Sequence, residues 1–286
     1  MGLFKKEKKE LEPQYYSSSL NTLLLNYNTY IMSKKEKFLY GIGSFFAGGL
    51  LGLIFYGGQF KNSDGENTLA TYICNLVIFC LVGIIARKVF IPLRKKQLEA
   101  KRKKQLTMQF RSFLDSLAVS LSSGMNVSDS LISASNDLKN EFSEDSYIVN
   151  EVNEMINGIE NNIPIEETIA FLGERSQISE IKNFGTVFSI SYRAGGNLKD
   201  IVRRTNDIIG EKIEISNEID TTLASNKTQF NAMMVIPIVM VLLLKFMSSS
   251  FSESFATIPG VIAVSIANVI FFISYKIGQK IMDIKG

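Results

Sequence analysis

The chain has 286 residues, a formal net charge of +3 and 46% hydrophobic residues. It contains neither histidine nor tryptophan, which excludes imidazole acid–base catalysis, phosphotransfer through histidine and His-ligated metal sites. The mean hydropathy of +0.12 is high for a soluble protein, while 21% charged residues are many for a pure transporter. Apolar segments long enough to span a bilayer alternate with charged segments, so two kinds of structure are expected.

Residues 1–36 are predicted to form a cytoplasmic N-terminal segment. Their Lys-rich start leads into polar sequence, which is not the pattern of a cleavable secretory signal. Apolar residues recur at intervals of three and four over residues 20–31, which predicts a one-faced helix with Ser19 as its N-cap. This helix would either lie on the membrane surface or pack on the rest of the protein, and the pattern fits both.

Residues 37–86 are predicted to form a first pair of transmembrane helices, at about 38–58 and 68–86. In the first of these, Ser44, Gly48 and Gly52 recur every fourth residue, and such a ladder of small residues lets another helix approach closely. Its partner would be either the second span of this chain or a second subunit.

Residues 87–104 form a basic juxtamembrane collar. From Arg87 to Arg111 there are ten Lys or Arg residues and a single acid, Glu99. By the positive-inside rule the collar stays in the cytoplasm, which places both termini and the following polar region inside. Pro92 lies within the collar and is predicted to end or kink the helix there.

Residues 105–229 are predicted to fold as a helical domain. Apolar residues recur at helical intervals, connectors are short and no alternating strand pattern occurs, which together favour an antiparallel bundle. Helix turns are marked by glycine followed by an Asn N-cap, at Gly124 and Asn126 and again at Gly195, Gly196 and Asn197.

A second pair of spans is predicted over residues 230–276, followed by a basic cytoplasmic tail at 277–286. The helical pattern that starts at Leu198 meets no strong breaker before the third span, so the two could form one rod. Lys245 is a charged residue inside an apolar run. It lies near the outer end of that run, where a lysine side chain is expected to reach the membrane–water interface. The predicted fold class is therefore an all-α, polytopic membrane protein with four transmembrane helices and one cytoplasmic antiparallel helical bundle between the two helix pairs.

No sequence motif of an active site is found. Walker, GxSxG, HExxH and acidic calcium-loop patterns are absent. Cys74 and Cys80 lie in an apolar segment without CxxC spacing and are interpreted as packing residues. Residues 112–229 contain nineteen acids and nine bases, which does not suit nucleic acid. We predict no enzymatic activity, no cofactor, no metal and no nucleic-acid partner.

The densest negative charge is predicted at residues 137–167, with nine acids and one base, at the end of the domain away from the collar. A basic partner surface would contact Glu144, Asp145, Glu151 and Glu154. The alternative is a solvated face that only keeps the domain soluble beside anionic lipid.

Three stretches together resemble the type II secretion system F domain, a helical cytoplasmic module. They are QFRSFLDSLAVSLSSGMNVSDSL at 109–131, NGIENNIPIEETI at 157–169 and FSISYRAGGNLKDIVRRTNDII at 188–209. The second glycine turn reads Tyr-Arg-Ala-Gly-Gly-Asn where many relatives have Gly-Glu-x-Ser-Gly, so no role of that acid is transferred.

One such domain between two pairs of spans is similar to the TadB-type platform proteins of Tad (Flp) pili. This resemblance implies a non-catalytic inner-membrane scaffold that couples a hexameric secretion ATPase to the assembly of prepilin or pilin subunits. It also implies pairing with a paralogous platform subunit or a second copy. The rival hypothesis is a transporter or channel with a regulatory helical domain, although the spans carry few of the polar residues that transport requires.

Overall fold

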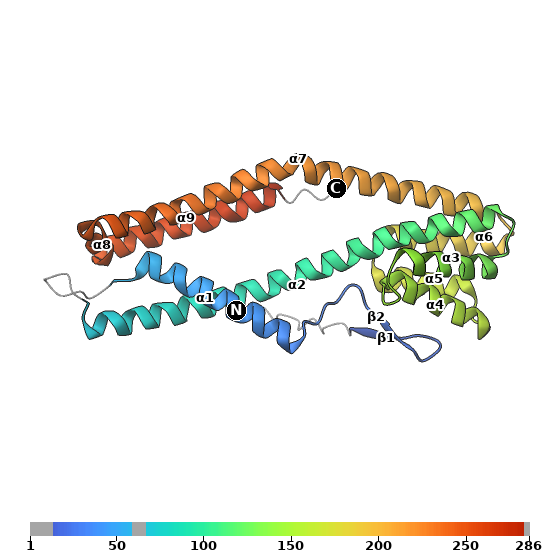
Figure 1. Ribbon diagram of the computed structural model, residues 1–286, viewed down its shortest axis with the longest axis horizontal. Helices are drawn as coiled ribbons and strands as arrows, with labels where there is room; N and C mark the ends of the chain where they lie inside the picture. Colours follow the sequence, from blue (N-terminus) through green and yellow to red (C-terminus); the bar gives the residue numbers. More distant parts are fainter. Residues whose placement is uncertain (1–13, 59–66, 283–286) are drawn as a thin grey trace, which may run out of the picture. The chain divides into compact units, whose positions relative to one another are not determined.

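The structure is a computed structural model that describes residues 14–58 and 67–282, which are predominantly helical (Figure 1). Its elements are β1 (Tyr15–Ser17), β2 (Leu23–Leu25), α1 (Lys34–Tyr56), α2 (Leu69–Ser122), α3 (Val127–Glu141), α4 (Tyr147–Glu160), α5 (Ile165–Ser176), α6 (Ser179–Arg193), α7 (Leu198–Met247), α8 (Ser249–Ala256) and α9 (Ile258–Met282). The described residues fall into two compact units. Unit 1 comprises 14–31 and 95–214, and unit 2 comprises 32–58, 67–94 and 215–282.

The helix predicted over residues 20–31, with Ser19 as its N-cap, is wrong. In its place β1 and β2 form an antiparallel hairpin in which Tyr15 pairs with Leu25. This segment belongs to unit 1, where Tyr27 is buried among the helices. We refer to residues 14–31 as the N-terminal strap.

Local side-chain hydrogen bonds explain why the strap is a hairpin. The Ser18 hydroxyl accepts hydrogen bonds from the backbone N–H groups of Leu20 and Thr22. Asn21 adopts the left-handed conformation, with φ of 59°, which closes the turn. Ser and Asn side chains compete with the helical ladder for backbone groups in this way, and here they outweigh the apolar periodicity.

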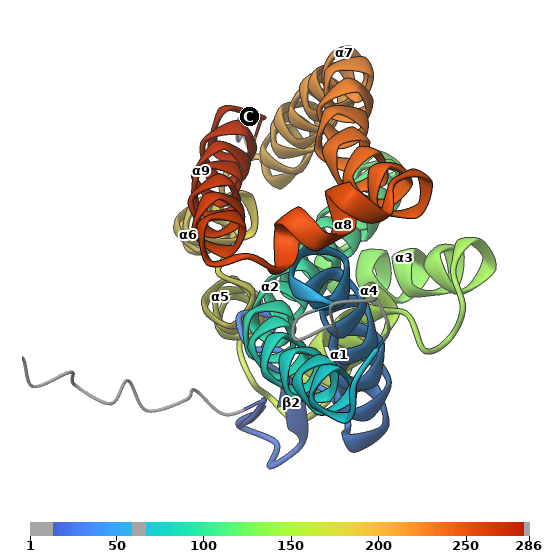
Figure 2. The ribbon, with the colours of Figure 1, turned by 90° about the vertical axis from the view of Figure 1, so that its left-hand side faces the viewer.

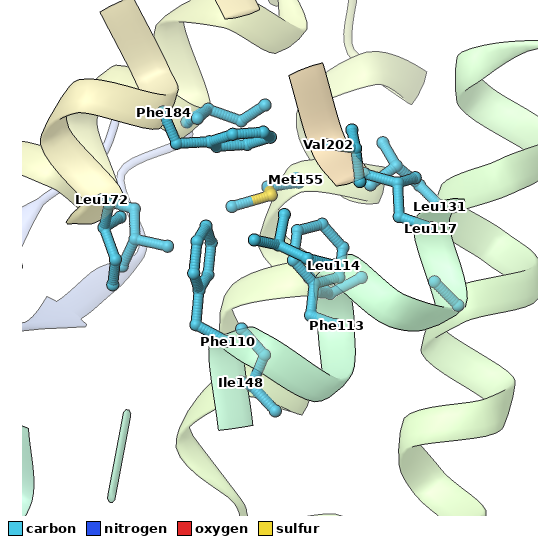
Figure 3. Packing of buried hydrophobic residues seen from close by; sticks show 14 of the residues in the cluster. Phe110, Phe113, Leu114, Leu117, Leu131, Ile148, Met155, Leu172, Phe184 and Val202 are labelled. Carbon is cyan, nitrogen blue, oxygen red and sulfur yellow. The ribbon is translucent and has the colours of Figure 1, made fainter. Parts of the chain in front are cut away.

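The core of unit 1 is formed by apolar side chains from α2 to α7 (Figure 3). Those labelled in the figure are at most 1% exposed: Phe110, Phe113, Leu114, Leu117, Leu131, Ile148, Met155, Leu172, Phe184 and Val202. The rings of Phe110 and Phe184 meet edge to face at 5.6 Å, which joins α2 to α6. Each such side chain contributes about 1.5–3 kcal/mol on burial, so this cluster fixes the arrangement of the helices in unit 1.

α2 and α7 are each a single long helix, of 54 and 50 residues. α2 continues through Pro92, so of the two outcomes predicted there, an end or a kink of the helix, the end is wrong. Proline removes one hydrogen bond, but the collar around it is rich in Lys, Arg, Gln and Leu, which favour helix. α7 is one continuous helix from Leu198 to Met247, with Pro237 inside it, as the pattern suggested. The polar stretch 248–257 within the predicted second pair of spans contains the short helix α8.

Within residues 14–58 and 67–282, four helices are long and apolar enough to cross a membrane: α1, α2, α7 and α9. Figure 2 shows α8 between α7 and α9, which it connects. Lys245, near the end of α7, donates a hydrogen bond to the carbonyl of Gly57 at 3.3 Å and lies 4.7 Å above the ring of Phe255. The charge within this apolar run is therefore held by contacts inside unit 2. Cys74 and Cys80 are free and half-buried.

The small residues of α1 pack on α2 of the same chain. A Cβ atom at Gly52 would lie 2.9 Å from Val82 Cγ2, and one at Gly48 would overlap Ala86 Cβ. Ser44 is half-buried, and its hydroxyl donates a hydrogen bond to the carbonyl of Gly41. Of the two partners considered for this ladder, the structure has the second span of the chain itself.

The Gly48–Ala86 contact predicts a compensating pair of substitutions. Gly48→Ala should lower the stability of the full-length chain in detergent by about 1–3 kcal/mol, because the added methyl group overpacks the contact with α2. Adding Ala86→Gly should restore it, because this removes the methyl group in the way. Gly43→Ala is the matched control, since nothing lies within 4 Å of a Cβ at that position. Thermal unfolding measures the effect, and equal loss in the single and double variants would contradict the packing.

Candidate functional site

Tyr27 anchors the strap in the core of unit 1. Its side chain is 1% exposed and meets the ring of Tyr147 edge to face at 5.6 Å. Its backbone N–H donates to the carbonyl of Arg175, and its hydroxyl donates to Glu151 Oε1 at 2.8 Å. Burial, followed by the neighbouring Glu151 carboxylate, raises the pKa of Tyr27 well above its usual value, so the hydroxyl stays a donor.

Glu151 and Arg175 form a buried ion pair beneath the strap. Their side chains are 5% and 2% exposed, and two hydrogen bonds join the guanidinium to both carboxylate oxygens. Arg175 also donates to the carbonyl of Leu25 at 2.8 Å and lies 4.7 Å above the ring of Phe171. The pair thus connects α4, α5 and the strap. A buried charge needs such partners because desolvation is costly.

The end of the strap is held by the collar. Arg102 donates to the carbonyl of Thr29 at 3.3 Å, and its guanidinium lies 4.6 Å above the ring of Tyr30. Lys103 donates to the Asn28 side chain, and Glu99 accepts from the backbone N–H of Tyr30. Part of the charge that the sequence assigned to membrane orientation therefore also binds the chain's own N-terminal segment.

A second ion pair fastens α6 to α7 within unit 1. Lys212 Nζ lies 2.6 Å from Glu180 Oε1. Burial opposes ionisation of Glu180, but hydrogen bonds from Lys212, its own backbone N–H and Ser179 outweigh it and lower its pKa.

The four acids proposed as partner contacts do not form one surface. Glu151 is buried in the pair with Arg175, and Glu154 accepts a hydrogen bond from the Thr22 hydroxyl at 2.5 Å. Both carboxylates therefore serve the strap, so Glu151 in particular is wrong as a surface contact. Glu144 and Asp145 are exposed in the connection between α3 and α4.

This connection does not lie at the end of unit 1 where it was expected. Gln109 accepts a hydrogen bond from the backbone N–H of Ile148, and the Ser112 hydroxyl donates to Glu141. The acids between these two contacts lie beside the middle of the unit 1 segment of α2, not beside its end at Ser122. The prediction that they lie away from the collar is wrong, because α3 folds back along α2.

Two turns adopt the geometry that their glycines permit. Gly124 and Gly195 have φ of 84° and 68°, in the left-handed region that favours glycine. After the first, Asn126 accepts a hydrogen bond from the backbone N–H of Asp129 and so caps α3. After the second, Gly196 donates its N–H to Ser191, and the Asn197 amide donates to the Asp200 carboxylate.

A hollow of about 330 Å³ lies where the start of α3, the α4–α5 turn and the end of α6 meet. Side chains from all three places line it, among them Val127, Ile159, Asn162, Pro164, Glu166 and Tyr192. Nearby, Met125 is 44% and Tyr192 is 42% exposed. Exposed apolar side chains around a hollow suit a protein partner, and the sequence analysis did not identify this surface.

The described part of the chain lacks the geometry of a metal centre. Residues 14–58 and 67–282 contain no group of three or more Cys, Asp or Glu side chains placed to hold a metal ion. The ion pairs Glu151–Arg175 and Glu180–Lys212 join elements of unit 1, which is a structural role.

Residues 113–244 match the family model described as Type II secretion system (T2SS), protein F. The match begins within α2, includes α3 to α6, and ends within α7, so it covers less than half of the chain. Searches of curated proteins and of solved structures found no match to this chain.

The buried pair predicts a strongly uneven set of stability losses. Arg175→Met should destabilise the full-length chain by about 3–5 kcal/mol, because it leaves the Glu151 carboxylate buried without its cation. Tyr27→Phe should cost about 1.5–3 kcal/mol, the value of a hydrogen bond to a charged group. Thermal unfolding and limited proteolysis in detergent measure both effects.

Arg193→Met is the control for this prediction. Arg193 pairs with Glu166, and their side chains are 66% and 10% exposed. Glu166 lines the hollow, so water can reach the carboxylate when Arg193 is removed, and the loss should be smaller, about 1 kcal/mol. The double variant Glu151→Leu with Arg175→Met should recover much of the stability that Arg175→Met loses, because no unpaired charge remains. Equal thermal unfolding midpoints for Arg175→Met and Arg193→Met would contradict the role of the buried pair.

Proposed function

We propose that this protein is a non-catalytic inner-membrane platform of a Tad- or type IV-like pilus, or of a type II secretion-like machine. It would couple a cytoplasmic secretion ATPase to the extraction of pilin from the membrane and its assembly into a filament. The observation that carries the proposal is the protein F match at 113–244, on a chain that also contains four apolar helices of spanning length.

The connections between the two units support a coupling role. The chain passes between them after residues 31, 94 and 214. At the last two places it does so within a continuous helix, α2 or α7. Backbone hydrogen bonds run along both helices apart from the donors missing at Pro92 and Pro237, so a displacement of unit 1 can be carried along them into the apolar segments. The strap provides the first connection, and Tyr27 fastens it to the core.

Unit 1 and both termini are proposed to lie in the cytoplasm, because basic residues flank the apolar segments at Lys34–Lys37 and in the collar. In a chain without Cys74 and Cys80, a cysteine introduced by Ser143→Cys should react with an impermeant thiol reagent only after lysis. One introduced by Asn67→Cys should react in intact cells. Both positions are exposed, so burial does not confound the result. Labelling of the Ser143→Cys variant in intact cells, and of the Asn67→Cys variant only after lysis, would show that the topology is the inverse of the one proposed.

The ATPase is proposed to contact unit 1 through the exposed carboxylates of Glu144 and Asp145. A basic partner surface would be attracted to them, and this attraction should weaken as salt shortens the Debye length from about 10 Å to 3 Å. Glu151 and Glu154 are left out of this surface because their carboxylates bind Arg175 and Thr22.

Complementation of a deletion strain tests the platform and its ATPase contact together. Deletion should abolish surface pili, and the unaltered chain should restore them. Glu144→Lys with Asp145→Lys should restore fewer and should weaken ATPase co-purification, because it reverses the contact charge. Glu211→Lys with Glu214→Lys makes the same charge change at exposed positions of α7 and should restore both.

Three outcomes would count against this proposal. Normal piliation of the deletion strain would remove the platform function. Equal piliation and equal ATPase co-purification in the two charge-reversal variants would show that the ATPase contact lies elsewhere, for example at the hollow beside Tyr192. Flux of a solute through proteoliposomes containing the chain would favour the transporter alternative.

A further inference from the structure

One face of α2 combines apolar and cationic side chains where the span becomes the collar. Ile84, Arg87, Lys88, Ile91 and Pro92 line a groove of about 440 Å³. They recur at intervals of three and four, so all five lie on one side of the helix. The first belongs to the apolar segment and the others to the start of the collar.

The two cations of this groove differ from those that hold the strap. Among the described residues, Arg87 and Lys88 are exposed and make no hydrogen bond or ion pair, whereas Arg102 and Lys103 bind the strap. Arg87 instead packs by its guanidinium against α1, with Nε 3.0 Å from where a Cβ of Gly41 would lie. Its charge is thus positioned but not neutralised by the protein.

The chemistry of the groove fits an amphipathic anion. Arginine binds phosphate oxygens through its planar fork and lysine as a point charge, so the pair suits one phosphate group. Pro92 has no N–H, so the Lys88 carbonyl loses its helical donor and can accept from a hydroxyl of a headgroup. The apolar side chains of Ile84 and Ile91 suit the upper part of an acyl chain and offer nothing to a free ion.

We propose that this groove binds an anionic phospholipid at the boundary between the span and the collar. Arg87 and Lys88 bind its phosphate, and the flanking apolar side chains contact its acyl chain. A soluble phosphate compound would use only the two cations, whereas a phospholipid uses both halves of the groove. This proposal rests on α2 crossing a membrane and does not depend on the pilus or secretion role.

Lipid binding by the purified full-length chain tests this assignment. In neutral detergent, the chain is titrated with phosphatidylglycerol, phosphatidylcholine or inorganic phosphate, and bound lipid is counted by native mass spectrometry. The unaltered chain should prefer phosphatidylglycerol. Arg87→Gln with Lys88→Gln should weaken that binding about thirty-fold at low salt, or about five-fold for each charge removed.

Lys96→Gln with Lys101→Gln is the matched control, because it removes two exposed collar charges outside the groove. This variant should bind phosphatidylglycerol like the unaltered chain. Equal weakening in both variants would overturn the proposal in favour of diffuse attraction to the whole collar. Displacement of the lipid by millimolar inorganic phosphate, or equal binding of phosphatidylcholine, would overturn it as well. Thermal unfolding of each variant verifies that the chain remains folded.

Discussion

Unit 1 depends on the neutralisation of one buried charge. The Glu151 carboxylate, enclosed by α4, α5 and the strap, has the Arg175 guanidinium and the Tyr27 hydroxyl as its partners. Either ion alone would be strongly destabilising in this position, so the three groups must assemble together. The cost of separating them makes the strap part of the folded unit and not an appendage. It also fixes where the chain leaves that unit toward α1.

The features that were predicted correctly are those set by local sequence. The long apolar helices follow from runs of apolar residues, and the helices of unit 1 follow from apolar periodicity. The cap of α3 follows from Asn126 and Asp129, three residues apart. Each of these signals is contained within one helix or one turn, where the governing hydrogen bonds and contacts are short-range.

The features that were missed depend on residues far apart in the chain. Tyr27 and Glu151 are 124 positions apart, and Glu151 and Arg175 are 24 apart, so no spacing rule connects them. Counting charges treated Glu151 as one more surface acid, although it is the acid that the fold uses. The helix predicted in the strap was wrong because of a local signal. The apolar residues there recur with a helical period, but Ser18 and Asn21 close a hairpin turn.

The collar shows that one run of like charge can serve several purposes along a single helix. Helix geometry sends successive side chains to different sides of α2, so a charge count cannot reveal which of them are engaged. Arg102 and Lys103 bind the strap, while Arg87 and Lys88 lie beside apolar side chains at the end of the span. The same helix that extends from the span into unit 1 therefore carries both the charges that hold the strap and those left for an outside anion. The charges that are predicted to orient the chain in a membrane and those that hold unit 1 together are therefore neighbours on α2. The effect of a substitution in the collar depends on the face of the helix on which the residue lies.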